Sequence, residues 1–138
     1  MSLYKDTDGV IASNGLAASG SLSAAPGFVS HSTATGLTAA GTTIADALAL
    51  TAAFNQVGTV ASGTGVKLPA AAPVGAEVIV QNLGANNLEV YPPDTSGVIN
   101  GASAGGAITL AAATDDVGRF VRTATNNWIA TVAAGPAT

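Results

Sequence analysis

The stretch that decides the fold is VGTVASGTGVKLPAAAPVGAEVIVQNLGANNLEVY, residues 57–91. Four of its segments are apolar or β-branched, as is typical of strands: Val57–Ala61, Val66–Leu68, Glu77–Gln81 and Leu88–Tyr91. The segments between them carry the glycine, asparagine and proline that tight turns require: Ser62–Gly65, Pro69–Gly75 and Gly84–Asn87. The stretch therefore predicts four strands, and Gly84–Asn87 is expected to close the last two into a hairpin.

Similar segments continue towards the C-terminus and predict further strands at Val98–Ile99, Ala107–Leu110, Arg119–Thr123 and Trp128–Val132. Thr42–Ala53 is ambiguous, because its alanine and leucine content favours a helix while its two-residue alternation favours a strand. We expect a strand there and keep a short helix as the alternative. About nine short strands without amphipathic helices between them predict an all-β domain over residues 42–132, an antiparallel jelly-roll-like sandwich.

Residues 1–41 differ from that domain, because their apolar residues form short clusters separated by glycine and serine. One interpretation is a flexible tail with weak strands. The other is an extended N-terminal arm that becomes ordered on a partner by strand addition. The predicted partner contacts of such an arm are Leu3, Tyr4, Val10, Ile11, Phe28 and Val29. Phe28–Val29 alternatively forms the first strand of the domain, and residues 133–138 are expected to be a C-terminal tail.

Composition excludes several classes of partner. The chain has 138 residues, a formal net charge of −4 and only 9% charged residues, so it lacks the basic patch of a nucleic-acid-binding or anionic-membrane-binding protein. No apolar run approaches the ~18 residues of a membrane span, and the start MSLYKDTDG lacks a secretory h-region. We therefore expect synthesis in a cytoplasm. The sparse charge and abundant small side chains indicate a protein that lives in an assembly.

Metal and phosphate motifs are incomplete. Asp6–Gly9 opens like a calcium loop, but Val10 and Ile11 stand where that loop needs an oxygen ligand and a glycine. His31 is the only histidine and there is no cysteine, so a usual zinc site is not expected. Gly63–Gly65 fits neither a P-loop nor a dinucleotide fingerprint and is interpreted as a hairpin turn. We expect no metal and no cofactor.

The charged residues near the C-terminus predict no catalytic site either. Asp115 and Asp116 precede Arg119 and Arg122, but adjacent strand residues point to opposite faces, so the carboxylates do not converge by default. A charged turn followed by a solvent-facing strand edge is the simpler interpretation. The chain has no Gly-x-Ser-x-Gly nucleophile elbow, so a hydrolase is disfavoured. We expect a protein that is not an enzyme.

The aromatic residues are few, at 4% of the chain. Trp128, Phe120 and Tyr91 could form an aromatic platform for sugar. Because Trp128 and Phe120 each anchor an alternating strand, we expect them in the core instead. Tyr91 precedes Pro92 and is expected at an edge.

The central motifs resemble a β-rich module of tailed-phage virion proteins over Thr42 to Ala130. The resemblance is closest to head decoration, or cement, proteins. It is carried by the VASGTGVKLP turn of residues 60–69, by the ING turn and by the terminal strand NNWIA. It is also carried by the V-x-N-x-G-A-N-x-L-x-V-Y-P pattern at Val80, Asn82, Gly84, Ala85, Asn86, Leu88, Val90, Tyr91 and Pro92.

The resemblance implies a structural virion protein on the outer surface of an icosahedral phage capsid. It would stabilise the shell by bridging neighbouring major capsid protein subunits, as a homo-dimer or homo-trimer. The alternative implied by the same module is a receptor- or carbohydrate-binding part of a head fibre or tail spike. Repetition around the shell would supply avidity to a modest single-site affinity.

Overall fold

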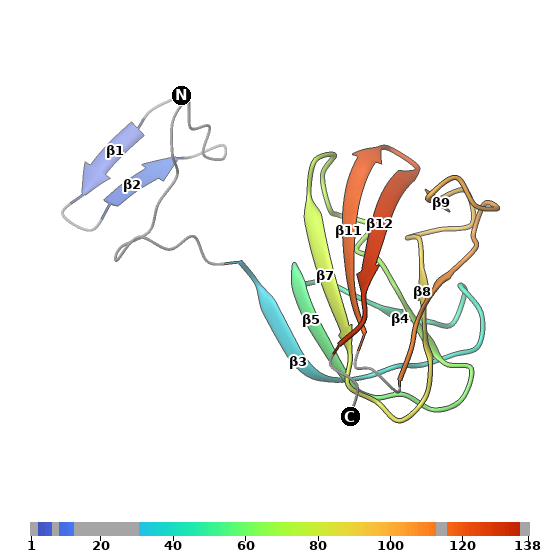
Figure 1. The fold of residues 1–138 in the computed structure, drawn as a ribbon. Helices are drawn as coiled ribbons and strands as arrows, with labels where there is room; N and C mark the ends of the chain where they lie inside the picture. Colours follow the sequence, from blue (N-terminus) through green and yellow to red (C-terminus); the bar gives the residue numbers. More distant parts are fainter. Residues whose placement is uncertain (1–2, 7–8, 13–30, 113–115, 136–138) are drawn as a thin grey trace. The chain divides into compact units, whose positions relative to one another are not determined.

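The computed structural model describes residues 3–6, 9–12, 31–112 and 116–135, and it divides the chain into two units, Met1–Ser30 and His31–Thr138 (Figure 1). The first unit contains β1 (Leu3–Asp6) and β2 (Gly9–Ala12), which pair as an antiparallel hairpin. Tyr4 lies opposite Ile11 in this pairing, and Leu3 lies opposite Ala12. No helix occurs among the described residues of either unit.

The second unit is built of two sheets. The six-stranded sheet has the order β3 (Thr33–Thr38), β5 (Phe54–Thr59), β7 (Glu77–Asn82), β11 (Val117–Ala124), β12 (Asn127–Ala133) and β9 (Val98–Ile99). The four-stranded sheet has the order β10 (Ile108–Leu110), β8 (Leu88–Tyr91), β6 (Gly65–Lys67) and β4 (Leu48–Ala49). Both sheets contain parallel and antiparallel neighbours, so the domain is all-β with two mixed sheets.

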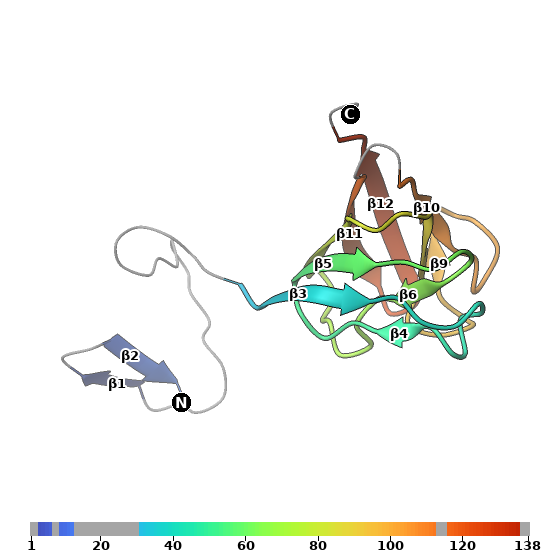
Figure 2. The same cartoon turned by 90° about the horizontal axis from the view of Figure 1, so that it is seen from below.

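Consecutive strands in the first half alternate between the sheets. β3, β5 and β7 pair in parallel in one sheet, and β4, β6 and β8 pair in parallel in the other. Figure 2 shows β3 beside β5 and β4 beside β6. Each connection β3–β4, β5–β6 and β7–β8 is therefore a β-arch, a turn whose two flanking strands belong to different sheets. The second unit begins with three stacked arches.

The remaining strands close one side of this stack. β11 pairs antiparallel with β7 and with β12, while β10 pairs antiparallel with β8. β9 pairs in parallel with the start of β12, at Val98–Asn127 and Ile99–Trp128. We call β9 to β12 the closing strands.

The core lies between the two sheets. Alternate residues of each strand point inward, and the side chains below 2% exposure include Val57, Val80, Phe120, Val66, Leu88, Val90, Ile99 and Leu110. Phe120 and Trp128 are the largest buried side chains, and both come from the closing strands. They are core residues, as the alternating pattern of their strands predicted.

The expectation of purely antiparallel pairing is wrong, and so is the predicted hairpin at Gly84–Asn87. β7 and β8 bond to different sheets because both strands carry inward valines, Val78 and Val80 on β7 and Val90 on β8, that are at most 2% exposed. A flat hairpin would leave one face of this pair to solvent unless another layer covered it. As an arch, the two strands cover each other. The Gly63–Gly65 turn is likewise part of an arch, and the jelly-roll-like sandwich stays a prediction.

An internal asparagine shapes the β7–β8 arch. Asn82 is fully buried, and its side-chain amide donates to the carbonyl oxygens of Asn86 (3.0 Å) and Leu110 (2.9 Å) while its Oδ1 accepts from the Gly84 N–H (3.0 Å). The Asn86 amide in turn donates to the Val60 carbonyl of the preceding arch (2.9 Å). A Cβ on Gly84 would lie 2.6 Å from the Val60 side chain, so only glycine fits this turn.

The start of the domain also differs from the expectation. Thr42–Ala53 was expected to be a strand, but only Leu48–Ala49 pairs, after a single turn in which Ala47 N–H donates to the Thr43 carbonyl (3.0 Å). The short helix kept as the alternative does not form. β3 pairs with β5, so the domain begins ahead of Thr42.

Candidate functional site

The outer face of the six-stranded sheet is the broadest candidate for an interaction surface. We define the outer sheet face by the outward residues of four adjacent strands: Phe54, Gln56, Glu77, Ile79, Gln81, Val117, Arg119, Val121, Ile129, Thr131 and Ala133. Strand register places Phe54, Ile79, Arg119 and Thr131 in one row, with Gln56, Gln81, Val117 and Ala133 in the next. The register therefore brings together on one face residues that are far apart in sequence.

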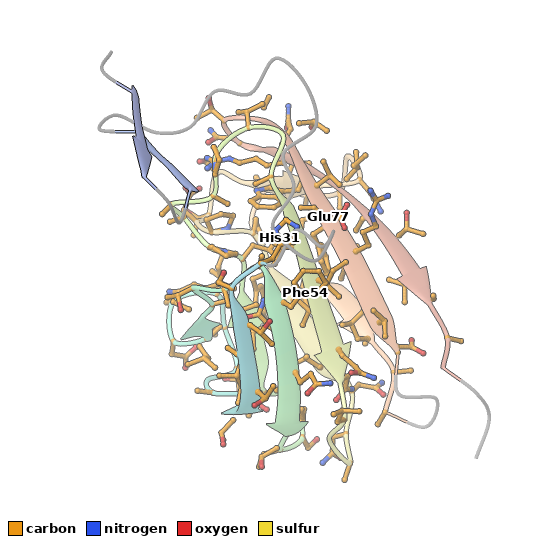
Figure 3. The ribbon with its side chains drawn as sticks, turned by 90° about the vertical axis from the view of Figure 1, so that its left-hand side faces the viewer. His31, Phe54 and Glu77 are labelled. Carbon is orange, nitrogen blue, oxygen red and sulfur yellow. The ribbon has the colours of Figure 1, made fainter. Side chains whose placement is uncertain are left out.

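Apolar side chains dominate this face. Phe54 is 39% exposed and pairs with Ile79, while Ile129 is 53% exposed and pairs with Val121. Phe54 also contacts His31, with ring centroids 5.6 Å apart; Figure 3 shows both near Glu77. Scattered single apolar residues are normal on a protein surface, but adjacent ones in register are typical of an interaction site.

The face carries one ion pair and little other charge. The Arg119 guanidinium lies 2.5 Å from the Glu77 carboxylate, and its Nε donates to the same oxygen at 2.6 Å. This hydrogen bond, followed by the carboxylate charge, raises the pKa of Arg119. Gln56 donates to Gln81 across β5 and β7 (3.0 Å). The polar groups thus largely satisfy each other, which lowers the cost of covering the face.

A groove of about 490 Å³ lies beside this face, between the β4–β5 and β6–β7 connections. Small apolar side chains line most of it, chiefly residues 49–53 and 69–73. Arg122 fixes the β6–β7 connection on one side of the groove, because its guanidinium donates to the carbonyls of Ala70 (3.2 Å) and Ala72. Ser32, Thr51 and Glu77 are the polar residues among those that line it.

The structure separates the charged residues expected near the C-terminus. Asp115 lies outside the described residues, and Asp116 is 8% exposed, with its carboxylate accepting from the Ala111 N–H (3.0 Å). Arg119 pairs with Glu77 across the sheet. Arg122 lies over the Trp128 ring, 5.8 Å from its centroid, and bonds to loop carbonyls. The expected charged turn with a solvent-facing strand edge is therefore wrong for Asp116 and Arg122, which have structural contacts.

The aromatic platform for sugar does not form. Trp128 is 2% exposed and Phe120 is fully buried. The ring of Tyr91 packs against Gly65, where an added Cβ would lie 2.8 Å from it, and the Tyr91 hydroxyl donates to the Thr42 carbonyl (3.4 Å). Burial is the largest cause of the raised pKa of Tyr91. These three rings therefore serve packing.

The predicted arm residues are placed only in part. Leu3 and Tyr4 lie on β1, and Val10 and Ile11 lie on β2, so the register of one hairpin brings these four positions together. Phe28 and Val29 lie outside the described residues. The role of all six residues as partner contacts stays a prediction.

Metal and membrane features can be stated for the described part of the chain alone. Within residues 3–6, 9–12, 31–112 and 116–135, no group of three or more histidine or acidic side chains is placed to hold a metal ion. In the same ranges, no helix has the length and hydrophobicity to cross a membrane.

The outer sheet face was missed in the sequence, although a signal for it was present. The two-residue alternation places Glu77, Ile79 and Gln81 on one face of their strand and Arg119 and Val121 on one face of theirs, but nothing in the sequence indicates that these two faces adjoin. Phe54 precedes the strand predicted at Val57–Ala61 and lies outside it.

In comparisons with known proteins, no family model, no curated protein and no solved structure matches this chain.

Proposed function

We propose that this chain is a structural virion protein that binds the outer surface of an icosahedral phage capsid and stabilises it by bridging neighbouring major capsid protein subunits. The observation that carries the proposal is the outer sheet face. Six of the eleven residues that define it are apolar, and its two charged residues form an ion pair with each other. Such a face can cover a joint between subunits without leaving a charge unpaired.

The arch stack supports the same role. Turns are held by buried side-chain hydrogen bonds, such as those of Asn82, and by glycines that neighbouring atoms crowd. A domain built in this way presents a rigid surface, and rigidity lowers the entropy cost of docking. Because each shell repeats the same joint many times, modest affinity at one copy is sufficient.

The proposed assembly is a homo-oligomer, a dimer or a trimer, with the first unit acting as an arm. The hairpin of β1 and β2 offers strand edges to which a neighbouring subunit could add a strand. Deleting residues 1–30, which leaves β3 in place, is expected to weaken shell binding. Unchanged binding by the shortened chain would remove the arm from the proposal.

Shell binding by matched surface variants tests the docking face. Purified protein is mixed with assembled shells lacking decoration, and bound protein is measured by sedimentation together with the heat resistance of the shells. Ile129→Lys on the outer sheet face is expected to weaken binding by about tenfold, since an exposed apolar contact becomes a charge that docking would bury. The control is Val74→Lys in the β6–β7 loop, at a residue that is 60% exposed.

The outcomes of this experiment are distinguishable. Wild-type protein that neither binds shells nor raises their heat resistance would refute the capsid function. Binding that Ile129→Lys and Val74→Lys leave equally strong would keep the function and refute the docking face. The alternative, a carbohydrate-binding module, has less support because Trp128, Phe120 and Tyr91 are engaged in packing; glycan binding lost in Tyr91→Ala would favour it.

A further inference from the structure

The turn after β9 contains an unusual side-chain contact. Asn100 follows Ile99, and its amide bonds to both backbone groups of Ala130 on β12: Nδ2 donates to the carbonyl (3.0 Å) and Oδ1 accepts from the N–H (2.7 Å). The Asn100 N–H donates to the Trp128 carbonyl (2.9 Å). The side chain therefore continues the pairing of β9 with β12 beyond its two backbone positions.

The backbone of this turn is held in a left-handed conformation. Asn100 has φ 53° and Gly101 has φ 70°, and the Ala102 N–H donates to the Ile99 carbonyl (3.0 Å). Positive φ at both central residues is the signature of a type I′ turn, for which Asn-Gly is the preferred dipeptide. Asparagine followed by glycine is also the pair most prone to spontaneous amide loss, because glycine offers no side chain to block its own backbone nitrogen.

We propose that Asn100–Gly101 is a self-modification site whose reaction is gated by the pairing of β9 with β12. In the reaction, the deprotonated backbone nitrogen of Gly101 attacks Cγ of Asn100, and the bond from Cγ to Nδ2 breaks. Ammonia leaves with the added proton, and a succinimide ring remains. Water then opens the ring at either carbonyl and yields aspartate or isoaspartate, so the net change is loss of ammonia and gain of water.

The observed contacts oppose this reaction in the folded chain. Ring closure requires Cγ of Asn100 to reach the nitrogen of Gly101, while both ends of the side-chain amide are held on Ala130. Because the two hydrogen bonds must break first, conversion requires local opening of β9. β9 is an edge strand of two residues that pairs with β12 on one side, and short edge strands open locally at low free-energy cost.

The product cannot restore the contact. A carboxylate has no hydrogen to donate to the Ala130 carbonyl and places negative charge beside that oxygen, so this hydrogen bond between the turn and β12 is lost. Isoaspartate also adds a methylene to the backbone of the turn. A transient opening of β9 would therefore become a permanent loosening of this sheet edge, next to the buried Ile99 and Trp128.

Conversion rates in the full chain test the gate. Protein is incubated at mildly alkaline pH, folded or in concentrated guanidinium chloride, and Asn100 conversion is measured by peptide mass mapping. We expect conversion in the folded chain to be slower by about tenfold or more, and Ile99→Ala, which loosens β9, to accelerate it. The other Asn-Gly pair, Asn14–Gly15, serves in the denatured sample as a reference for solution conditions.

Two outcomes of the rate measurement would overturn the proposal. One is a folded-chain rate equal to the denatured rate; the other is a folded-chain rate that Ile99→Ala does not change. The loosening of the sheet edge after conversion is tested with Asn100→Asp, which is expected to lower the melting temperature of the protein. Its matched control is Asn126→Asp, an exposed residue that contacts β9 through its backbone carbonyl, at 2.8 Å from Val98 N. Equal melting temperatures for the two variants would also contradict it.

Discussion

In the arch half of the domain, β3 to β8, strands that are consecutive in sequence bond to different sheets, whereas β11 and β12 of the closing half pair directly through a two-residue turn. The arch half fills its part of the core with valine and leucine and holds its turns with Asn82, Asn86 and tightly packed glycine. The closing half contributes Phe120 and Trp128. Both halves therefore bury apolar side chains, but the arch half also holds its turns with side-chain hydrogen bonds, and the closing half supplies the two large rings.

The largest effect is expected from emptying the aromatic core. Phe120→Ala removes a fully buried ring and should lower the free energy of unfolding by about 3–5 kcal/mol, measured by urea denaturation. Ile129→Ala, on the exposed side of the adjacent strand, should change it by about 0.5 kcal/mol or less. Similar losses for both variants would mean that burial in the closing strands does not control stability.

The internal asparagine of the arch half should come next. Asn82→Ala leaves the Leu110 carbonyl and the Gly84 N–H without their partner, so the free energy of unfolding should fall by about 2–4 kcal/mol. Asn87→Ala, which loses one exposed contact to the Ala112 N–H, should cost about 0.5–1 kcal/mol. If the two variants were equally stable, the buried hydrogen bonds of Asn82 would stabilise the arch no more than the exposed hydrogen bond of Asn87 does.

Gly84→Ala tests the close packing between arches without removing a hydrogen bond. Its Cβ would lie 2.6–2.8 Å from Val60 atoms, one of them backbone nitrogen, so we expect a loss of about 1–3 kcal/mol in chemical denaturation. The matched control is Gly58→Ala, whose Cβ would meet only Gly36 Cα at 3.8 Å. The interpretation fails if Gly84→Ala is as stable as Gly58→Ala.

Arg122 links the two halves, and its effect should be smaller. Lysine cannot reproduce the fork that reaches the Ala70, Ala72 and Thr125 carbonyls, so Arg122→Lys should cost about 1 kcal/mol. Arg119→Lys changes only the exposed pair with Glu77, and its unfolding midpoint should match that of the wild type. If Arg119→Lys lowered the free energy of unfolding more than Arg122→Lys, then Arg119 and not Arg122 would be the structurally important arginine.

The smallest effect is expected from two turn aspartates, one in each half. Hydrogen bonds from Thr43 lower the pKa of Asp46, and hydrogen bonds from Ser96 lower the pKa of Asp94. A lowered folded-state pKa stabilises the fold above the ordinary value of 3.8. That contribution is lost as the pH falls through the folded-state pKa.

Acid titration of stability measures this contribution. With Asp46→Asn and Asp94→Asn combined, the unfolding midpoint should fall less steeply below about pH 4 than in the wild type. Identical slopes would show that the two turns are not coupled to folding through these carboxylates. The single variants then assign the difference to the β3–β4 arch or to the β8–β9 connection.

Strand positions were largely predictable from the sequence. Leu88–Tyr91 and Val98–Ile99 match the observed bounds, and the predictions around Val66, Glu77, Ile108 and Trp128 differ by one residue at one or both ends. Phe54 and Asn55 lie outside the strand predicted at Val57–Ala61. Asn55 is in fact buried, and its amide donates to the carbonyls of Ala52 and Ile79, which makes an inward polar residue tolerable.

The arches left a signal that was not recognised. β3, β5 and β7 begin at Thr33, Phe54 and Glu77, at intervals of 21 and 23 residues, and turn glycines follow at Gly41, Gly63 and Gly84. A recurrence of this length indicates stacked repeats. It was obscured because the inward residues differ from one arch to the next.

The sequence by itself determined which segments are strands, which residues turn the chain and which rings enter the core, because side-chain period and backbone preference act locally. Only the tertiary structure decided the partner of each strand. A Gly-rich turn between alternating strands serves a hairpin or an arch equally well, and the choice depends on which apolar faces meet across the core. The same choice placed Phe54, Ile79 and Ile129 on one outer face, so the candidate site was also a tertiary outcome.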